Sequence, residues 1–219
     1  MELGQDGDRA LDRQRRPRLP RKERERLRHR DEVLQAAETL LERRSYRDLT
    51  VQEIAEEAEF SVGYLYKLFG SKEDIFATLI KQKSRMLRDL FDRHLLSNLP
   101  TRERLLGLVR ALMAWLHENT AFATTYVREL RTLALSNEEL AHAKEENEEH
   151  ALKRLHAFFQ EAIDRGELGS GEPPVMAKTL WSLMWGFIEE DLIRGERRDW
   201  TDYADPIVGI VTRAFPPQS

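Results

Sequence analysis

Cysteine is absent from the 219-residue sequence. The chain therefore forms no disulfide bond, and it has no thiolate to ligate a metal or to act as a nucleophile. Nothing in its composition calls for an oxidising compartment. We expect a cytoplasmic protein.

Long apolar runs are also absent. The densest apolar segment, Leu180 to Ile188, is far shorter than the roughly 18 residues that a membrane-spanning helix needs. The N-terminal residues contain acids, arginines and prolines but lack the apolar core of a secretory signal. We therefore expect no membrane partner.

Signatures of catalysis are missing as well: the sequence has no glycine-rich phosphate loop, no G-x-S-x-G and no H-E-x-x-H. One cluster could ligate a metal, because His142, Glu146 and His150 recur at i, i+4 and i+8 on one helical face. The surrounding segment KEENEEH is more typical of a solvated acidic face. We predict no enzyme activity, no cofactor and no metal site.

Strand signals are equally scarce, since no stretch alternates apolar and polar residues for long and no Asn-Gly hairpin occurs. After residue 30 the apolar residues recur at helical spacing, which predicts an all-α fold. The segment 165–174, RGELGSGEPP, is predicted to be a loop. The expected helices are 31–44, 50–58, 61–69, 72–95, 102–119, 121–136, 137–165, 173–194 and 202–215.

Charge is distributed unevenly along the chain, whose net charge is −4. Residues 9–30 hold 11 Lys/Arg against 3 acidic residues, a local net charge of +8. Such a run is either a solvated, disordered tail or an arm attracted to polyanions. We treat residues 1–30 as a basic and flexible arm.

A tight helical unit occupies residues 50–76. Thr50 with Glu53 matches a capping box, and the apolar residues that follow recur at i, i+3, i+4 and i+7, which predicts one buried face. A break at 59–61 leads to a second helix with Ser61 as its N-cap and Gly70 at its end. Two short helices joined by a three-residue turn are typical of a helix-turn-helix, whose second helix enters the DNA major groove.

The second helix of this unit has an outward face that could read DNA. If Leu65 is the centre of its buried face, Gly63 and Lys67 point the opposite way, and Tyr64 and Tyr66 flank them. Lys67 is the best candidate to contact a base. Tyr66 has an alternative role, in which its ring packs into the core and only the hydroxyl is exposed.

A set of residues in the segment 31–80 forms a specific pattern: Ala36-Ala37, Leu49-Thr50, Ile54-Ala55, Ala58, Ser61, Gly63, Leu65-Tyr66, Phe69 and Ser71-Lys72-Glu73. In this pattern the segment resembles the TetR family of transcriptional regulators. Two departures are Glu59 and Ser45, at positions where family members usually or often have glycine. A non-glycine residue in a left-handed conformation costs about 1 kcal/mol, so either the turn tolerates strain or its geometry differs slightly.

The resemblance implies specific DNA contacts. Thr50, Tyr66 and Lys72 would contact phosphates, and Lys72 would do so at the start of a helix, where free backbone N–H groups also lie. Thr50 and Ser61 could instead be helix caps alone. Base-edge or groove contacts are implied for Ser61, Val62, Gly63, Tyr64 and Lys67.

Residues 81–219 are expected to bind an effector and to form a homodimer, as the C-terminal helices of TetR proteins do. The helices 173–194 and 202–215 carry more apolar surface than one face needs, which favours a bundle core or a subunit interface. The dimer residues predicted from them are Trp181, Met184, Ile188, Ile207 and Val211. The predicted effector residues, each of which could also be ordinary core, are Met113, Trp115, Phe122, Tyr126, Phe158 and Trp185.

The sequence therefore predicts three parts: an arm (1–30), a helix-turn-helix domain (31–80) and an effector-binding and dimerisation domain (81–219). We expect a homodimeric repressor that binds double-stranded DNA at a palindromic operator and leaves it when a small apolar or amphipathic effector shifts the helix 72–95. The alternative is a DNA-bound scaffold whose C-terminal domain recruits a protein. A remote third reading is an enzyme that uses the His142 cluster.

Overall fold

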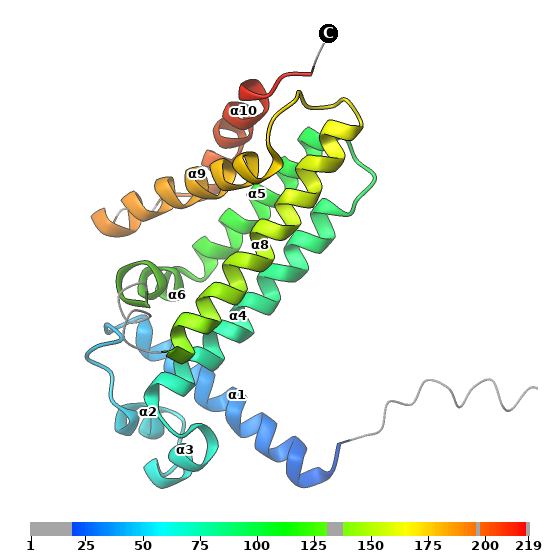
Figure 1. The fold of residues 1–219 in the computed structure, drawn as a ribbon. Helices are drawn as coiled ribbons and strands as arrows, with labels where there is room; N and C mark the ends of the chain where they lie inside the picture. Colours follow the sequence, from blue (N-terminus) through cyan, green and yellow to red (C-terminus); the bar gives the residue numbers. More distant parts are fainter. Residues whose placement is uncertain (1–18, 131–137, 196–197, 218–219) are drawn as a thin grey trace, which may run out of the picture.

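The computed structural model describes residues 19–130, 138–195 and 198–217, and every regular element in these ranges is helical (Figure 1). The elements are α1 (Arg21–Leu41), α2 (Val51–Glu57), α3 (Val62–Phe69), α4 (Lys72–Leu95), α5 (Thr101–Glu118), α6 (Thr120–Thr125), the π-helix η2 (Tyr126–Leu130), α8 (Glu138–Asp164), α9 (Pro173–Arg194), the 3-10 helix η3 (Trp200–Tyr203) and α10 (Ala204–Ala214).

Side-chain caps fix the starts of the short helices. Thr50 accepts a hydrogen bond from the backbone N–H of Glu53, whose carboxylate accepts one from the N–H of Thr50, so the predicted capping box is present. Ser61 caps α3 and Ser71 caps α4 in the same way. Because α2 and α3 are too short to be stable alone, these caps and the packing against α1 and α4 hold them in place.

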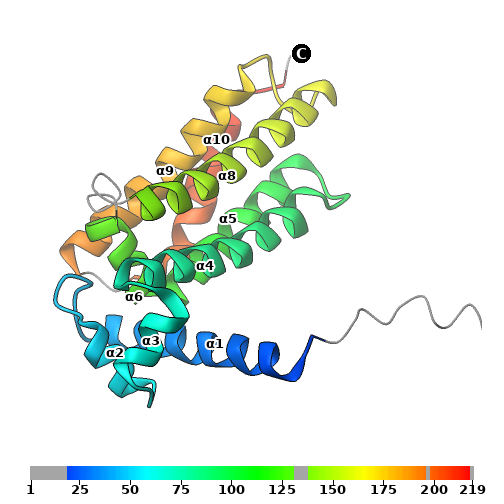
Figure 2. The ribbon, with the colours of Figure 1, turned by 60° about the horizontal axis from the view of Figure 1, so that its bottom comes forward.

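The C-terminal part is a bundle built along α4. This helix is about 36 Å long and packs against α8 and α5, while α9 packs on α8 and α10 packs on α5 (Figures 1 and 2). Arg104 of α5, which is buried, donates to both carboxylate oxygens of Glu161 on α8 at 3.0 and 3.1 Å. This pair ties two inner helices together.

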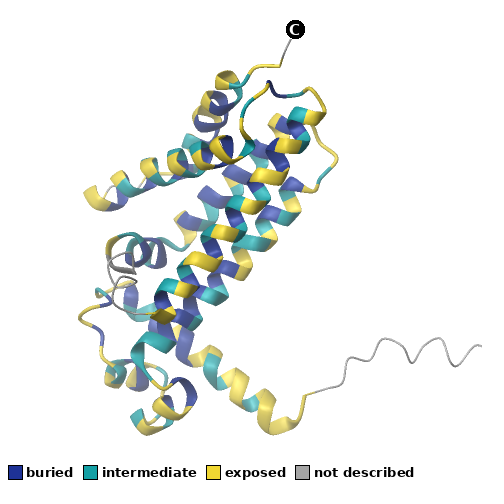
Figure 3. Cartoon of the chain, in the orientation of Figure 1, coloured by how far each residue is buried: buried dark blue, intermediate teal, exposed yellow. Residues whose placement is uncertain are grey.

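Two apolar cores run through the molecule, and the predicted boundary at residue 80 does not separate them. One core joins α1 to α4 and also contains Phe122, Tyr126, Leu140 and Ala143 from the C-terminal part. The other fills the bundle. The helix-turn-helix segment is therefore packed continuously against α6, η2 and the start of α8, and buried residues recur along the length of α4 (Figure 3).

The structure corrects two predicted helix boundaries. Helix α1 begins at Arg21 rather than at residue 31, so the last third of the segment treated as a flexible arm is helical; residues 1–18 lie outside the described residues. The helix predicted over 121–136 is divided into α6 and η2, and residues 131–137 lie outside the described ranges. Helices α4 and α9 have the predicted bounds. In the described ranges, no helix is long and apolar enough to cross a lipid bilayer.

Candidate functional site

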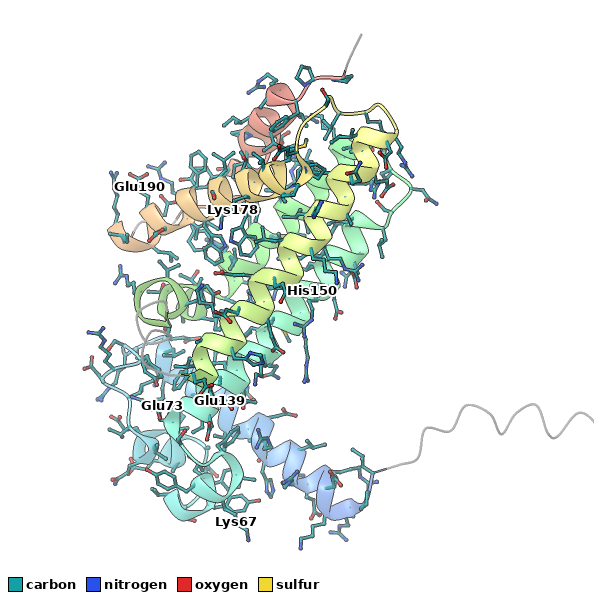
Figure 4. All side chains as sticks on the ribbon, in the orientation of Figure 1. Lys67, Glu73, Glu139, His150, Lys178 and Glu190 are labelled. Atoms are coloured by element: carbon teal, nitrogen blue, oxygen red, sulfur yellow. The ribbon has the colours of Figure 1, made fainter. Side chains whose placement is uncertain are left out.

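A strip of exposed side chains runs along α3. Ser61, Gly63, Tyr66 and Lys67 are exposed, and 51% of the Tyr66 surface is accessible, so its ring is not part of the core. Leu65 is buried on the opposite side, as its spacing predicts. Figure 4 labels Lys67 at the outer end of the molecule, where α3 lies. The strip can offer hydroxyl and ammonium groups to a ligand outside the chain.

Gly63 lies in the middle of this strip. A Cβ atom added there would have no other atom within 4 Å, so nothing inside the chain requires glycine. Glycine in a helix costs about 0.5–1 kcal/mol relative to alanine. The cost is explained if a partner outside the chain approaches the backbone of α3 closely.

The turn between α2 and α3 holds α3 at a fixed angle. Glu59 has φ = 58°, the left-handed conformation expected at this position. The N–H of Phe60 donates to the carbonyl oxygen of Ala55 at 2.9 Å, and the N–H of Glu59 donates to that of Glu56 at 3.2 Å. These two bonds form a Schellman motif, in which glycine is the usual residue at the position of Glu59.

Lys72 is placed differently from the prediction. Its ammonium group donates to the carbonyl oxygens of Tyr46 at 2.9 Å and Leu49 at 2.7 Å, and it lies 4.3 Å from the centre of the Tyr46 ring. The group therefore fastens the segment between α1 and α2 to the start of α4. Its assignment as a phosphate ligand is corrected, because these interactions inside the chain use the ammonium group.

The remaining predicted contacts are less exposed or serve as caps. Val62 and Tyr64 are half-buried. The Thr50 hydroxyl is exposed, but it already takes part in the capping box and donates to Glu53 at 2.9 Å. The most accessible groups of this region are therefore those of the α3 strip.

Helix α1 contributes residues that the sequence analysis missed. The Nδ1 atom of His29 lies 2.8 Å from the hydroxyl of Tyr64, and the His29 ring also packs against Phe60. Arg30 donates to the carbonyl oxygen of Leu68 at the end of α3, and its guanidinium group lies 4.1 Å from the centre of the Phe69 ring. These residues brace α3. They lie three and four residues before Val33, so an extension of the apolar stripe of α1 would have indicated them.

A second candidate site is a cavity of about 380 Å³ between η2, α8 and α9. Tyr126 of η2 and Trp185 of α9 stack in its wall, with ring centres 5.6 Å apart and planes at 21°. Trp181 packs edge-on against Trp185 at 5.8 Å. The other lining residues are Val127, Lys144, Glu148, Lys178, Ser182, Gly186 and Glu189.

Four of the six predicted effector residues lie at or next to this cavity. Tyr126 and Trp185 line it. Phe122 lies behind Tyr126, with ring centres 6.1 Å apart, and Trp115 lies 6.1 Å further on. The structure therefore brings together aromatic residues from α5, α6, η2 and α9.

The other two predicted effector residues do not line this cavity. Met113 of α5 and Phe158 of α8 are buried in the bundle core. Their role in this structure is packing. The sequence could not separate them from the cavity residues because both groups are apolar and helical.

The predicted dimer residues are largely internal. Met184, Ile188, Ile207 and Val211 are buried within the chain's own core, and Trp181 lines the cavity. A side chain that is buried in one chain cannot contact a second one. The assignment of these four residues to a subunit interface is therefore corrected. The physical reason is that α9 and α10 use their most apolar faces to pack on the bundle.

The His142 cluster does not form a compact site. His142 and Glu146 are both exposed, with Nε2 and Oε1 3.5 Å apart. His150 is half-buried near α4, where burial and then the charge of Arg88 lower its pKa. In the part of the chain that the structure describes, no group of three His, Asp or Glu side chains is arranged to hold a metal ion.

Known proteins share this domain and this fold. Residues 33–79 match the model of the bacterial regulatory proteins of the tetR family, whereas no curated protein sequence matches the chain. The solved structure of FadR from Bacillus subtilis with stearoyl-CoA has a TM-score of 0.74 and 20% identity, covering 83% of this chain and 96% of that one. SmeT, the repressor of the Stenotrophomonas maltophilia multidrug efflux pump SmeDEF, has a TM-score of 0.70 and 20% identity, covering 85% of this chain and 89% of that one. The complex of SmeT with triclosan has a TM-score of 0.70 and 18% identity, covering 87% of this chain and 96% of that one.

At these identities the solved structures show the fold, and the match over residues 33–79 coincides with the helix-turn-helix and the helices that brace it. The chain therefore carries the helix-turn-helix domain of the bacterial regulatory proteins of the tetR family, within a fold that solved TetR-family structures share.

Proposed function

We propose that the chain is a repressor that binds a palindromic operator as a homodimer and dissociates from it when a small effector occupies the cavity between η2, α8 and α9. The observation that carries the proposal is the exposed strip on α3, with Gly63 at its centre and His29 and Arg30 of α1 behind the helix. A braced helix with an open outer face suits insertion into the major groove.

The test of operator binding is the selection of bound fragments from random DNA. We expect a palindrome, because a two-fold symmetric dimer reads two half-sites. Lys67→Ala should weaken operator binding by roughly 1–3 kcal/mol per half-site and relax the preference at one symmetric base pair. A uniform loss on all sequences would make Lys67 a phosphate contact and would move base reading to Ser61, Tyr64 or DNA shape.

The homodimer is proposed to form through the outward face of α9 and the adjacent surface of α10. Val175 and Ile193 are separated by five helical turns and so point the same way; 61% of the Ile193 surface is exposed. Ile210 of α10 is also exposed. These side chains replace the buried residues that the sequence favoured.

Sedimentation of the intact chain tests this interface. We expect a dimer at micromolar concentration, and Ile193→Asp should dissociate it without unfolding it, because Ile193 is exposed in the single chain. Met184→Asp is the contrasting variant, since it would place a charge in the core and unfold the protein. A folded wild-type monomer at the same concentration would contradict the proposal.

The effector role of the cavity is supported by its position between η2, α8 and α9 and by the ligands of two proteins with a similar fold. FadR from Bacillus subtilis was solved with stearoyl-CoA and SmeT with triclosan. The alternative, a scaffold that recruits a protein through its C-terminal domain, does not require a cavity. Thermal shift with a panel of apolar compounds should find ligands that raise the melting temperature and weaken operator binding, and by linkage the operator must weaken their binding equally. Ligands that stabilise the protein but leave operator affinity unchanged would favour the scaffold.

A further inference from the structure

We infer that the cavity between η2, α8 and α9 selects a compact aromatic molecule that carries one negative charge, such as an aromatic carboxylate. The inference rests on the proposed effector function and names the chemical class of its ligand. It follows from the wall, the charges and the size of the cavity.

The apolar part of the wall is aromatic. Trp181, Trp185 and Tyr126 all line the cavity, and the ring centres of successive neighbours are 5.8 and 5.6 Å apart. Large flat surfaces favour a flat ligand, because stacked and edge-on ring pairs gain about 0.5–1.5 kcal/mol beyond the area that they bury. A flexible acyl chain gains only the free energy of burying its apolar surface.

The Tyr126 hydroxyl is a polar group that needs a partner. The Tyr126 side chain is nine-tenths buried, and its hydroxyl oxygen has no hydrogen bond of ordinary geometry. Burial and, next, the carboxylate of Glu148 raise the pKa of Tyr126, while Asn147 acts more weakly in the opposite direction. A tyrosine hydroxyl is protonated at neutral pH and can donate a hydrogen bond to an anionic oxygen. A buried polar group without a partner is costly, so a ligand that supplies an acceptor is favoured.

The charges of the wall favour an anion. Lys144 and Glu148 neutralise each other, with Nζ and Oε1 2.8 Å apart. Glu189 already takes part in interactions within the chain. Lys178 is exposed at the cavity wall on α9 (Figure 4), and the described part of the chain provides no ion pair for it. The ammonium group of Lys178 is therefore the cation of the wall that an anionic ligand can pair with.

Size and local backbone structure agree with this class. Ligand cavities range over roughly 300–1,000 Å³, so a cavity of about 380 Å³ suits one or two rings better than a long chain. The wall that carries Tyr126 is a π-helix, a rare element that is frequent at functional sites. Arg128 of the same π-helix donates to the carbonyl oxygens of Leu192 and, at 3.2 Å, of Ile193 at the end of α9. Two walls of the cavity are thus linked directly.

Calorimetric titration of the full-length protein tests the ligand class with three probes: 2-naphthoate, its neutral analogue 2-naphthalenemethanol, and decanoate. We expect 2-naphthoate to bind at least tenfold more tightly than either of the others. Lys178→Met should abolish the preference for 2-naphthoate over the neutral alcohol, and Tyr126→Phe should weaken 2-naphthoate binding several-fold. Lys153→Met, on the exposed face of α8 and outside the cavity, removes the same charge and should bind like the wild type.

Equal affinity for the acid and the alcohol, or tighter binding of decanoate, would overturn the inference. So would wild-type affinity for 2-naphthoate in both Lys178→Met and Tyr126→Phe. Operator binding, measured in parallel, separates this failure from that of the proposed function. If decanoate or the alcohol releases the operator, the effector function stands and the ligand class is wrong; if 2-naphthoate binds as expected and the operator stays bound, the ligand class stands and the effector function fails.

Discussion

At the scale of single residues, Gly63 and Glu59 are two residues that make the folded chain less stable than a substitution would. Gly63→Ala should raise the free energy of unfolding by about 0.5–1 kcal/mol, because the added methyl group meets no atom of the chain. The same methyl group would meet a base or phosphate, so operator affinity should fall at least tenfold. Chemical denaturation and operator titration measure the two effects.

Glu59→Gly is the matched control for this prediction. It relieves the left-handed conformation at φ = 58° and should stabilise the fold by up to about 1 kcal/mol. Operator binding should stay at the wild-type level, because the change lies in the turn and not on the α3 strip. Unchanged operator binding in Gly63→Ala would show that α3 does not approach DNA closely.

Lys72 is the residue whose expected role changes most, and the prediction for it changes accordingly. Lys72→Met should destabilise the fold by about 1–2 kcal/mol, because two carbonyl oxygens lose a charged donor. Where the protein remains folded, the salt dependence of DNA binding should equal that of the wild type. A salt slope reduced by about one unit per subunit would instead restore Lys72 as a phosphate contact.

At the scale of secondary-structure elements, we expect helix α1 to extend the DNA-binding surface beyond the helix-turn-helix. Its N-terminal half projects from the body and is mostly exposed (Figure 3). Lys22 and Arg26 precede Arg30 at intervals of four residues, and Arg30 contacts the end of α3. Lys22 and Arg26 therefore lie near the face of α1 that adjoins α3, where they can neutralise phosphates beside the groove, whereas Arg30 is held by its contacts with α3.

The double variant Lys22→Gln/Arg26→Gln should weaken binding to operator and random DNA alike and lower the salt slope by about two units per subunit. Arg85→Gln/Arg93→Gln is the control: both arginines are exposed on α4, well past its start beside α3, and the net charge changes equally. If both double variants lower the slope equally, the contribution of α1 is only general electrostatic attraction. Fluorescence anisotropy at several salt concentrations gives the slopes.

The elements differ in how well their sequences predict them. Helices α4 and α9 were predicted with their observed bounds because Ser71 and Pro173 mark their starts. The start of α1 was missed because its first turns contain few apolar residues besides Leu27, although arginine, lysine and glutamate favour helices. Periodicity cannot detect a helix whose face is exposed, and it cannot choose the inner face of α9, which is apolar on several sides.

At the scale of the whole molecule, a row of aromatic contacts joins the cavity to the DNA-binding domain. Trp185 stacks on Tyr126, which contacts Phe122, which in turn contacts Trp115. The ammonium group of Lys83 on α4 lies 5.9 Å from the centre of the Trp115 ring. This route was not predictable from the sequence, because it depends on which side chains of five separate elements meet in space.

Lys83 is the point where this route reaches α1. Its side chain is buried, and its ammonium group donates to the carboxylate of Glu38 on α1 and, at 2.7 Å, to the side-chain oxygen of Asn119 between α5 and α6. A displacement of η2 and α6 by an effector would therefore act on α1 as well as on α4. The effect expected from the sequence was a shift of α4 alone.

Lys83→Met should reduce the coupling between effector and operator, which is typically 1–3 kcal/mol, while each binds the variant alone nearly as it binds the wild type. Both affinities, measured with and without the other ligand, give the coupling free energy. The control is Arg104→Met, which also breaks a buried ion pair, that with Glu161, but in the bundle core away from the aromatic row. Both variants should lose stability, and Lys83→Met alone should lose coupling. Equal coupling in Lys83→Met and the wild type would show that the signal reaches the helix-turn-helix through the packing of α4 and not through Lys83.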